Sequence, residues 1–288
     1  MEPHEERYEI LEKLGEGGYA TVHLAFDPQE RVLVAVKRLR SCSAKDPVNV
    51  LYFLHEQQIL SVLDVRGVPR VSGMGESGGL PYFAMEFVDG ATLEAHIRNH
   101  GLDRIDAAWL LFCVALLVHE IHEAGVVHGD LKPDNVLVDT AGNPWLVDFG
   151  AASVLSEAPR PEEDDLIVGT LAYISPEIVR EGVRGRSVRS DVYALGVMLY
   201  DILAGRLPFD GDSQTQILEE IETRDAPPLH EVVPGISRAL SLVVMRALAR
   251  RPADRYPSAR HFARALGTAL KREGVRAARS AAEPIAAA

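Results

Sequence analysis

The sequence predicts an α+β fold of two lobes, the first built on an antiparallel sheet and the second mostly helical. Up to residue 87, short apolar runs with a two-residue alternation are separated by glycine-containing turns, and one helical stretch interrupts them. From residue 92 onward the apolar spacing becomes helical. The length of 288 residues suits one large two-lobed domain or two modest ones.

The N-terminal lobe is expected to contain five strands and one main helix. The strands are predicted at residues 8–15, around Val22, Leu24 and Phe26, and at 31–39, 68–73 and 80–87. Three glycines, Gly75, Gly78 and Gly79, mark the hairpin between the last two strands. The helix is predicted at 46–63, with its apolar positions at Val50, Leu51, Leu54, Ile59, Leu60 and Leu63.

The C-terminal lobe is expected to consist of helices joined by loops. They are predicted at residues 92–99, 103–124, 187–204, 214–222, 237–249 and 258–270. Thr92 is the expected N-cap of the first, and Gly125 and Gly205 are expected to end the second and third. The stretch after Asp148 is too long for an ordinary connection, which indicates a functional loop. The Ala-rich tail, 271–288, is expected to be mobile or a linker.

Composition excludes several classes of protein. The net charge of −12, from 42 acidic and 30 basic residues, argues against nucleic-acid binding. The only cysteines, Cys42 and Cys113, lie far apart, so we expect no disulfide framework and a cytoplasmic location. The polar start predicts no signal peptide. The longest apolar run, 107–118, has 12 residues, whereas a membrane span needs roughly 18.

Two features of the N-terminal lobe point to an anionic ligand. Gly15-Glu16-Gly17-Gly18 follows the first strand, and glycines let backbone N–H groups approach a phosphate, although plain hairpins use the same residues. Lys37 lies inside an apolar strand, where an ammonium needs a partner. Glu56 lies on the following helix, and from the residues alone the two could be an unrelated exposed pair of little energetic value.

The stretch 128–150 concentrates ionisable groups around two short apolar strands. Asp130, Lys132 and Asn135 precede the first strand, and Asp148 follows the second, so we expect all four to converge. Such a convergence is unfavourable unless a cation or charged ligand lies among them. Asn135 and Asp148 offer hard oxygens suited to Mg²⁺, which leaves Asp130 to accept a proton. The alternative is a set of solvated turn residues.

These stretches resemble the catalytic and magnesium loops of the protein kinases. The residues that carry the resemblance are His128-Gly129-Asp130-Leu131, Lys132, Asn135 and Asp148-Phe149-Gly150, together with the glycine turn and Lys37. In detail, the glycine turn, residues 126–128 and residues 254–259 are most similar to bacterial Ser/Thr kinases of the eukaryotic-like type. The resemblance covers residues 8–270 and implies an N-lobe at 8–87, a hinge at 86–90 and a C-lobe at 91–270.

The resemblance implies a signalling enzyme that transfers the γ-phosphoryl group of ATP, with Mg²⁺ or Mn²⁺, to Ser and Thr hydroxyls of protein substrates. Asp130 would be the base, Lys132 would neutralise charge on the γ-phosphoryl group, and Asn135 and Asp148 would hold the metal. Lys37, held by Glu56, would bind the α- and β-phosphates. The implied ATP contacts are Gly15, Glu16, Gly17, Gly18, Val22, Ala35, Lys37, Glu56, Met85, Glu86, Val88 and Leu137.

The resemblance also implies structural roles outside the ATP site. Thr170 would touch Asp130 and Lys132, and Glu177 would form a buried pair with Arg255. Asp191 would accept backbone N–H bonds from the catalytic loop, unless it is simply an acid favoured by the helix dipole. His128, Phe149 and Gly150 complete the structural set. His119 and His122 are expected to be packing or surface residues, because no ligand cluster accompanies them.

Gly129 departs from the family pattern, because protein kinases commonly carry an Arg there that pairs with a phosphorylated activation loop. Activity is therefore expected not to require that phosphorylation. The acidic run Glu162-Glu163-Asp164-Asp165 could mimic phosphate, or could be a solvated loop. Two competing functions are a small-molecule phosphotransferase of the aminoglycoside or choline kinase type, which often reads His-Gly-Asp here, and a pseudokinase binding module. The resemblance also admits a homodimer formed through the N-lobe.

Overall fold

The computed structural model describes residues 7–155 and 171–273, which divide into two compact units. The first comprises Met1–Asp89 and Val147–Gly150, and the second comprises Gly90–Leu146 and Ala151–Ala288. The division falls within the expected hinge, but the Asp148 loop belongs to the first unit although the chain on either side of it belongs to the second.

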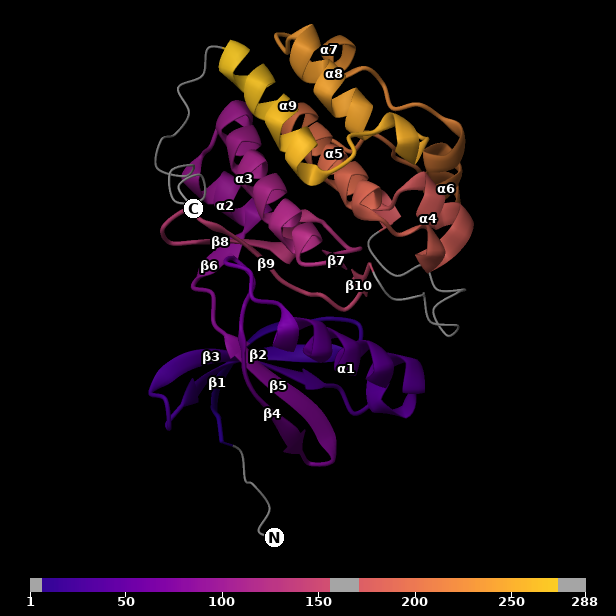
Figure 1. The fold of residues 1–288 in the computed structure, drawn as a ribbon. Coiled ribbons are helices and arrows are strands. Elements are labelled where there is room, and N and C mark those ends of the chain that lie inside the picture. The colour runs from indigo at the N-terminus through magenta and orange to yellow at the C-terminus, as the bar shows by residue number, and fades with distance from the viewer. Residues whose placement is uncertain (1–6, 156–170, 274–288) are drawn as a thin grey trace. The chain divides into compact units, whose positions relative to one another are not determined.

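The first unit is built on the five-stranded antiparallel sheet that the alternation predicted (Figure 1). Its strands are β1 (Glu9–Glu16), β2 (Ala20–Asp27), β3 (Val32–Leu39), β4 (Val71–Ser77) and β5 (Leu80–Glu86), in the order β1-β2-β3-β5-β4. The register pairs Ala25 with Val34 and Val36 with Ala84. These side chains, with Tyr8, form a buried cluster on one face of the sheet.

Helix α1 (Pro47–Val62) packs beside this sheet and begins where a capping residue predicts (Figure 1). Asp46 accepts a hydrogen bond from the Val48 amide, and proline occupies the first helical turn. The predicted buried face was partly wrong, because Leu51 and Leu54 are 42% and 45% exposed. Phe53 is fully buried instead and contacts the ring of Phe83, with centroids 5.2 Å apart. The helix carries apolar residues on more than one side, so the spacing of these residues in the sequence does not show which side packs against the sheet.

Strand β4 lies later in the chain than predicted, whereas β5 begins at residue 80 as expected. The turn between them is at Gly78 and Gly79, both with positive φ, whereas Gly75 lies within β4. A Cβ at Gly75 would lie 2.8 Å from the Tyr82 hydroxyl on the paired strand. This glycine therefore makes room for a cross-strand aromatic side chain and is not a turn residue.

The second unit contains eight α-helices and five short strands among its described residues. The helices are α2 (Leu93–His100), α3 (Arg104–Glu123), α4 (Pro176–Glu181), α5 (Val188–Ala204), α6 (Gln214–Thr223), α7 (Leu229–Val232), α8 (Arg238–Ala247) and α9 (Ala259–Arg272). The strands are β6 (Gly90–Thr92), β7 (Val126–Val127), β8 (Val136–Asp139), β9 (Pro144–Leu146) and β10 (Ser153–Val154). The sequence did not predict α4, α7, β6, β7 or β10, all of which have six residues or fewer.

Helices α3 and α5 form the core of this unit, and α9 packs against both (Figure 1). Thr92 and Asp103 cap α2 and α3 through hydrogen bonds to backbone amides, and Gly125 and Gly205 follow α3 and α5 with positive φ. Within the described part of the chain, α3 is the one helix long and apolar enough to cross a membrane, with a mean hydropathy of 1.6. Its most apolar stretch is 72% buried inside the protein, as in a core helix of a globular domain.

Short strands hold both ends of the loop 128–135. Strand β7 ends at Val127, immediately before the loop, and pairs with β10, while β8 begins at Val136, immediately after it, and pairs with β6 and β9. Asp139 closes the β8–β9 turn by accepting hydrogen bonds from the amides of Ala141 and Asn143 and from the indole of Trp145. The loop is thus a short connection between two anchored strands.

Candidate active site

The loop 128–135 of the second unit, called the catalytic loop below after the family that it resembles, brings three predicted residues together. The Lys132 ammonium lies 2.8 Å from a carboxylate oxygen of Asp130. The Asn135 side-chain nitrogen donates to the same carboxylate at 3.0 Å and to the Asp130 carbonyl at 2.8 Å. These bonds fix the Asp130 side chain, which is largely buried, and turn the amide oxygen of Asn135 away from it. Within this unit the loop presents a carboxylate, an ammonium and an amide oxygen in one place.

Asp191, in the first turn of α5, holds the backbone of this loop. Its buried carboxylate accepts the amide of His128 at 2.9 Å and that of Gly129 at 3.0 Å, the bonds that the sequence led us to expect. The ring of His122 on α3 lies 2.8 Å from the same carboxylate. Burial alone would raise the pKa of Asp191, but the hydrogen bond from His122, electrostatic interactions with His122 and His128, and the Gly129 amide keep that pKa below its ordinary value.

His122 is a site residue that the sequence did not identify. It is buried and connects α3 to the Asp191 carboxylate, which lies 69 residues along the chain. His119, which precedes His122 on α3, is also buried, and its ring nitrogen lies 3.9 Å from a carboxylate oxygen of Glu123. The spacing of the two histidines could not predict this contact, because Asp191, the partner of His122, is distant in sequence.

Gly129 occupies a position that disfavours any side chain. Its φ is +76°, and a Cβ there would lie 2.5 Å from the carbonyl oxygen of Ala151 and 3.3 Å from the guanidinium of Arg186. The first contact is closer than side chains tolerate, and the backbone conformation itself is strained for an L-residue. Glycine is therefore the residue that this backbone conformation favours, and the guanidinium group of Arg186 lies beside it.

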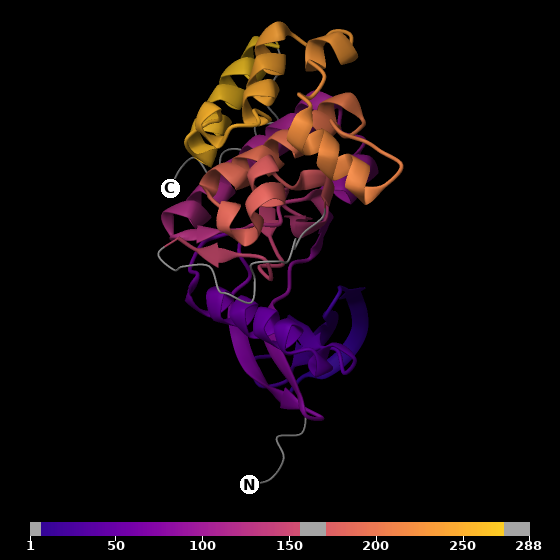
Figure 2. The ribbon, with the colours of Figure 1, turned by 90° about the vertical axis from the view of Figure 1, so that its right-hand side faces the viewer.

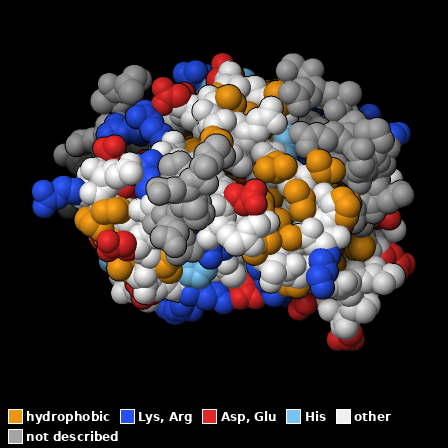
Figure 3. All heavy atoms as spheres, turned by 90° about the horizontal axis from the view of Figure 1, so that it is seen from below, with side chains coloured by type: hydrophobic (Ala, Val, Ile, Leu, Met, Phe, Trp, Pro, Cys, Tyr) orange, Lys and Arg blue, Asp and Glu red, His pale blue; other side chains and the backbone are white. Residues whose placement is uncertain are grey.

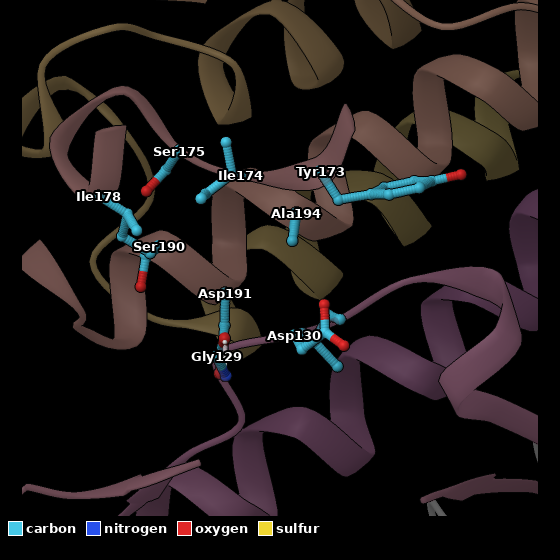
Figure 4. Close-up of a pocket in the computed structure, with 10 residues that line it drawn as sticks. Gly129, Asp130, Tyr173, Ile174, Ser175, Ile178, Ser190, Asp191 and Ala194 are labelled. Carbon is cyan, nitrogen blue, oxygen red and sulfur yellow. Dashed lines mark hydrogen bonds between the residues drawn. The ribbon is translucent and has the colours of Figure 1, made fainter. Parts of the chain in front are cut away.

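A small pocket of about 20 Å³ separates the catalytic loop from the segment that follows residue 170. Figure 4 shows Tyr173, Ile174 and Ser175 on the opposite side of this pocket from Gly129, Asp130 and Asp191. The Ser175 hydroxyl is buried and has no hydrogen-bond partner within residues 7–155 and 171–273. The volume is enough for one water molecule, which would satisfy such a hydroxyl.

The first unit contains the Lys37 cluster. The Lys37 ammonium donates to both carboxylate oxygens of Glu56, at 2.6 and 2.7 Å, and to Asp148 at 2.9 Å. Lys37 and Glu56 are buried, whereas the Asp148 side chain is 44% exposed. Burial acts to lower the pKa of Lys37, but the two carboxylates outweigh it and raise that pKa. The ammonium is therefore charged.

Tyr19, from the glycine turn, completes this cluster. Its hydroxyl donates to Glu56 at 3.0 Å, and the Lys37 ammonium lies 5.4 Å from the centre of its ring. A Cβ at Gly150 would overlap the Tyr19 hydroxyl, so this contact explains the glycine that follows Phe149. Phe149 itself is fully buried, and Asp148 adopts a positive φ of 64°, an unusual conformation for a non-glycine residue at a functional site.

Arg40, the residue that follows β3, holds the glycine turn through two hydrogen bonds. Arg40 donates its amide to the Tyr19 carbonyl at 2.9 Å and its guanidinium to the Gly17 carbonyl at 3.2 Å. A Cβ at Gly15 or Gly18 would meet no atom within 4 Å, so nothing crowds these two positions. The other predicted ATP contacts of this unit lie on the strands and the chain after β5: Glu16 on β1, Val22 on β2, Ala35 on β3, Met85 and Glu86 on β5, and Val88. Leu137 lies on β8 in the second unit.

Glu177 and Arg255 form the predicted pair in the second unit. Two guanidinium nitrogens of Arg255 each lie 2.6 Å from a Glu177 carboxylate oxygen, and the remaining N–H groups donate to the carbonyls of Ala249, Arg189 and Arg250. The ring of Tyr193 lies 4.7 Å away. Arg255 thus has five hydrogen bonds for its five N–H donors.

Thr170, the acidic run at 162–165 and most of the tail, 274–288, lie outside the described residues. Among the residues that are described, no group of three His, Cys, Asp or Glu side chains could hold a metal on its own. The partly exposed Asp148 carboxylate of the first unit and the Asn135 amide of the second each offer a hard oxygen, the type of ligand that Mg²⁺ prefers.

Comparison with known proteins agrees with this geometry. Residues 8–265 match the model of the protein kinase domain. The chain is 37% identical over 265 residues to the serine/threonine-protein kinase PknB of Mycobacterium leprae, covering 89% of this chain and 42% of that protein. It is 33% identical over 265 residues to PrkC of Bacillus subtilis, covering 92% and 40%. The chain therefore spans about two-fifths of these relatives. It belongs to the protein kinase family, as a catalytic domain of the bacterial, eukaryotic-like Ser/Thr type.

Proposed function

We propose that this chain is an ATP-dependent kinase that phosphorylates Ser and Thr hydroxyls of proteins. The observation that carries the proposal is the arrangement of Asp130, Lys132 and Asn135, in which one fixed carboxylate is bonded to an ammonium and an amide. The names of the relatives, which are serine/threonine-protein kinases, support the same activity.

In the proposed reaction the substrate oxygen forms a bond to the γ-phosphorus while the bond from that phosphorus to the ADP oxygen breaks. Asp130 accepts the proton of the substrate hydroxyl, and Lys132 offsets the negative charge on the transferred group. Lys37 binds the α- and β-phosphates, and Glu56 orients its ammonium. Asn135 and Asp148 would hold Mg²⁺ or Mn²⁺, which neutralises phosphate charge when bound.

Transfer of labelled phosphate from ATP to a generic basic protein tests this proposal. Asp130→Asn should lower the rate about 10²–10⁴-fold, because the substitution removes the base. Asp134→Asn is the matched control, since Asp134 is an exposed carboxylate in the same loop, and this variant should keep the wild-type rate. Equal rates for Asp130→Asn and wild type would overturn the assignment of Asp130.

The same assay separates the two competing functions. The His128-Gly129-Asp130 sequence favours a small-molecule phosphotransferase, which would label an aminoglycoside or choline but no protein. A pseudokinase would label neither. Labelling of protein substrates alone is the result expected for the proposed function.

We also propose that activity does not require phosphorylation of the activation segment. Gly129 has no side chain to pair with a phosphate there, and its φ of +76° disfavours an arginine in its place. Protein treated with a phosphatase should therefore keep a rate close to that of untreated protein. A collapse of the rate after this treatment would refute this part of the proposal without affecting the assignment of Asp130.

A second copy of the chain is the partner we propose for the first unit. Of the eleven large apolar side chains that are exposed among the described residues, nine belong to this unit: Ile10, Leu11, Leu14, Val32, Leu33, Leu51, Leu54, Val62 and Met74. Figure 3 shows orange apolar side chains gathered on a face of this unit. Exposed apolar side chains that gather on one face are typical of an interaction site.

Sedimentation velocity tests the dimer. Val62→Asp together with Leu11→Asp should shift the protein to the monomer, because both side chains are more than half exposed and each gains a charge. Leu242→Asp is the control, since Leu242 is equally apolar and 65% exposed but belongs to the second unit. A wild-type protein that is monomeric at high concentration would exclude the dimer.

A further inference from the structure

Helices α8 and α9 of the second unit form a groove that the proposed reaction does not use. The two helices lie side by side (Figure 2), and the groove between them has a volume of about 420 Å³. Its floor is apolar and includes the buried side chains of Val243, Tyr256 and Ala269. A floor of this composition suits an apolar side chain of a partner.

The rim of the groove is positively charged. Arg246 on α8 and Arg264 and Arg272 on α9 line it, and all three are exposed. None of these guanidinium groups forms an ion pair with a carboxylate of the described chain, and Arg246 lies 4.5 Å over the ring of Tyr256. His261 also lines the groove, and its ring bonds to the Ser258 hydroxyl. Glu273, which lies at the end of α9, is hydrogen-bonded to Ser237.

This concentration of positive charge is unusual for the chain as a whole. The net charge is −12, and some other exposed arginines of the second unit have carboxylate partners: Arg98 with Glu94, Arg224 with Glu220 and Arg251 with Asp254. Like charges around one groove repel each other, and an anionic partner would relieve that repulsion. Arginine pairs with carboxylates through two parallel hydrogen bonds, so the rim is suited to acidic side chains.

Leu242 extends the apolar surface to the outer edge of the rim. It precedes Arg246 by one helical turn on α8 and is 65% exposed. An apolar side chain beside three arginines fits a peptide that carries carboxylates around an apolar residue. A nucleic acid fits less well, because its phosphate backbone carries no apolar side chain to match the apolar floor.

We infer that the α8–α9 groove is a docking site for an acidic segment of a partner protein. The three arginines bind its carboxylates, and the apolar floor with Leu242 receives one apolar side chain. Such a site would bind its partner independently of ATP and of Asp130, because every residue in it lies on α8, α9 or the short connection between them.

Fluorescence anisotropy with a labelled peptide of glutamates around one central leucine tests this inference. The wild-type chain should bind this peptide, bind its lysine counterpart at least tenfold more weakly, and lose affinity as salt is added. Replacing Arg246, Arg264 and Arg272 together with glutamate should weaken binding by roughly tenfold or more, since each ion pair at an exposed rim contributes modestly. Leu242→Asp should weaken it further without changing sedimentation.

The matched control replaces Arg98, Arg224 and Arg251 with glutamate. It makes the same change in net charge and leaves the groove intact, so it should bind the peptide within about twofold of wild type. Tryptophan fluorescence of each variant checks that the second unit is folded. Equal binding by the groove variant and the control variant would overturn the inference. Tighter binding of a single-stranded oligonucleotide than of the peptide, or a groove variant that alters self-association, would overturn it in favour of a different occupant.

Discussion

Replacing Glu177 with glutamine should destabilise the second unit strongly. Glu177 and Arg255 are 5% and 0% exposed, and the carboxylate accepts two hydrogen bonds of 2.6 Å from the guanidinium. Glutamine keeps the size of the side chain but carries no charge and has only one oxygen that can accept. The guanidinium then stays buried with its charge uncompensated and at least one N–H donor without a good acceptor.

The size of the effect follows from the other contacts of Arg255. Three of its five donors still bond to the carbonyls of Ala249, Arg189 and Arg250, so the guanidinium cannot turn toward solvent without breaking them. A buried ion pair that loses one partner destabilises a protein by about 3–5 kcal/mol. We expect about 3 kcal/mol for Glu177→Gln, because glutamine retains one acceptor, and a value nearer 5 kcal/mol for Glu177→Ala.

Urea unfolding followed by tryptophan fluorescence measures this loss of stability in the second unit. Trp109 and Trp145 are the only tryptophans of the chain, and both belong to the second unit, as do Glu177 and Arg255. The unfolding midpoint of Glu177→Gln should fall while the slope m remains that of the wild type. The signal comes from the second unit alone.

Glu94→Gln provides the matched control. Glu94 pairs with Arg98 at 3.5 Å on α2 in the same unit, but both side chains are about 70% exposed. Exposed pairs contribute less than about 1 kcal/mol, so this variant should unfold close to the wild-type midpoint. A loss below about 1 kcal/mol for Glu177→Gln, or equal losses for the two variants, would refute the reasoning from burial.

Three further results are expected. Asp191→Asn should make the free energy of unfolding fall less steeply as the pH is lowered. The folded-state pKa of Asp191 is depressed, so its contribution to stability is present above about pH 4 and is lost as pH falls through the folded pKa. An equally steep fall in the wild type and the variant would contradict this. Tyr19→Phe should lower the stability of α1 by about 1 kcal/mol, seen as faster hydrogen exchange there, because the hydrogen bond to Glu56 is lost; unchanged exchange would argue against that bond. Gly129→Ala should destabilise more than Gly205→Ala, since both have positive φ but only Gly129 faces a carbonyl, and equal urea midpoints would exclude that contact.

Local signals in the sequence were sufficient for most elements of the fold. The ends of α3 and α5 follow from Asp103, Ser187, Gly125 and Gly205, whose effects act within one helical turn. The five strands of the first unit follow from alternation and turns, although β4 was placed too early because Gly75 looked like a turn residue. Among the elements of two to six residues, the strands β8 and β9 were predicted, whereas β7 and α4 carry too little pattern to be predicted.

The sequence by itself determined the chemical groups of the site and their order, because Lys37, Glu56, Asp130, Asn135 and Asp148 occur in the spacing of a family pattern. Only the tertiary structure decided which other residues contact the site and its supporting loop. His122 reaches Asp191, Tyr19 reaches Glu56, and Ala151 excludes a side chain at Gly129. Spacing along a helix or strand specifies neighbours within a few residues, whereas the burial and hydrogen-bond partners of a side chain depend on segments that packing brings together.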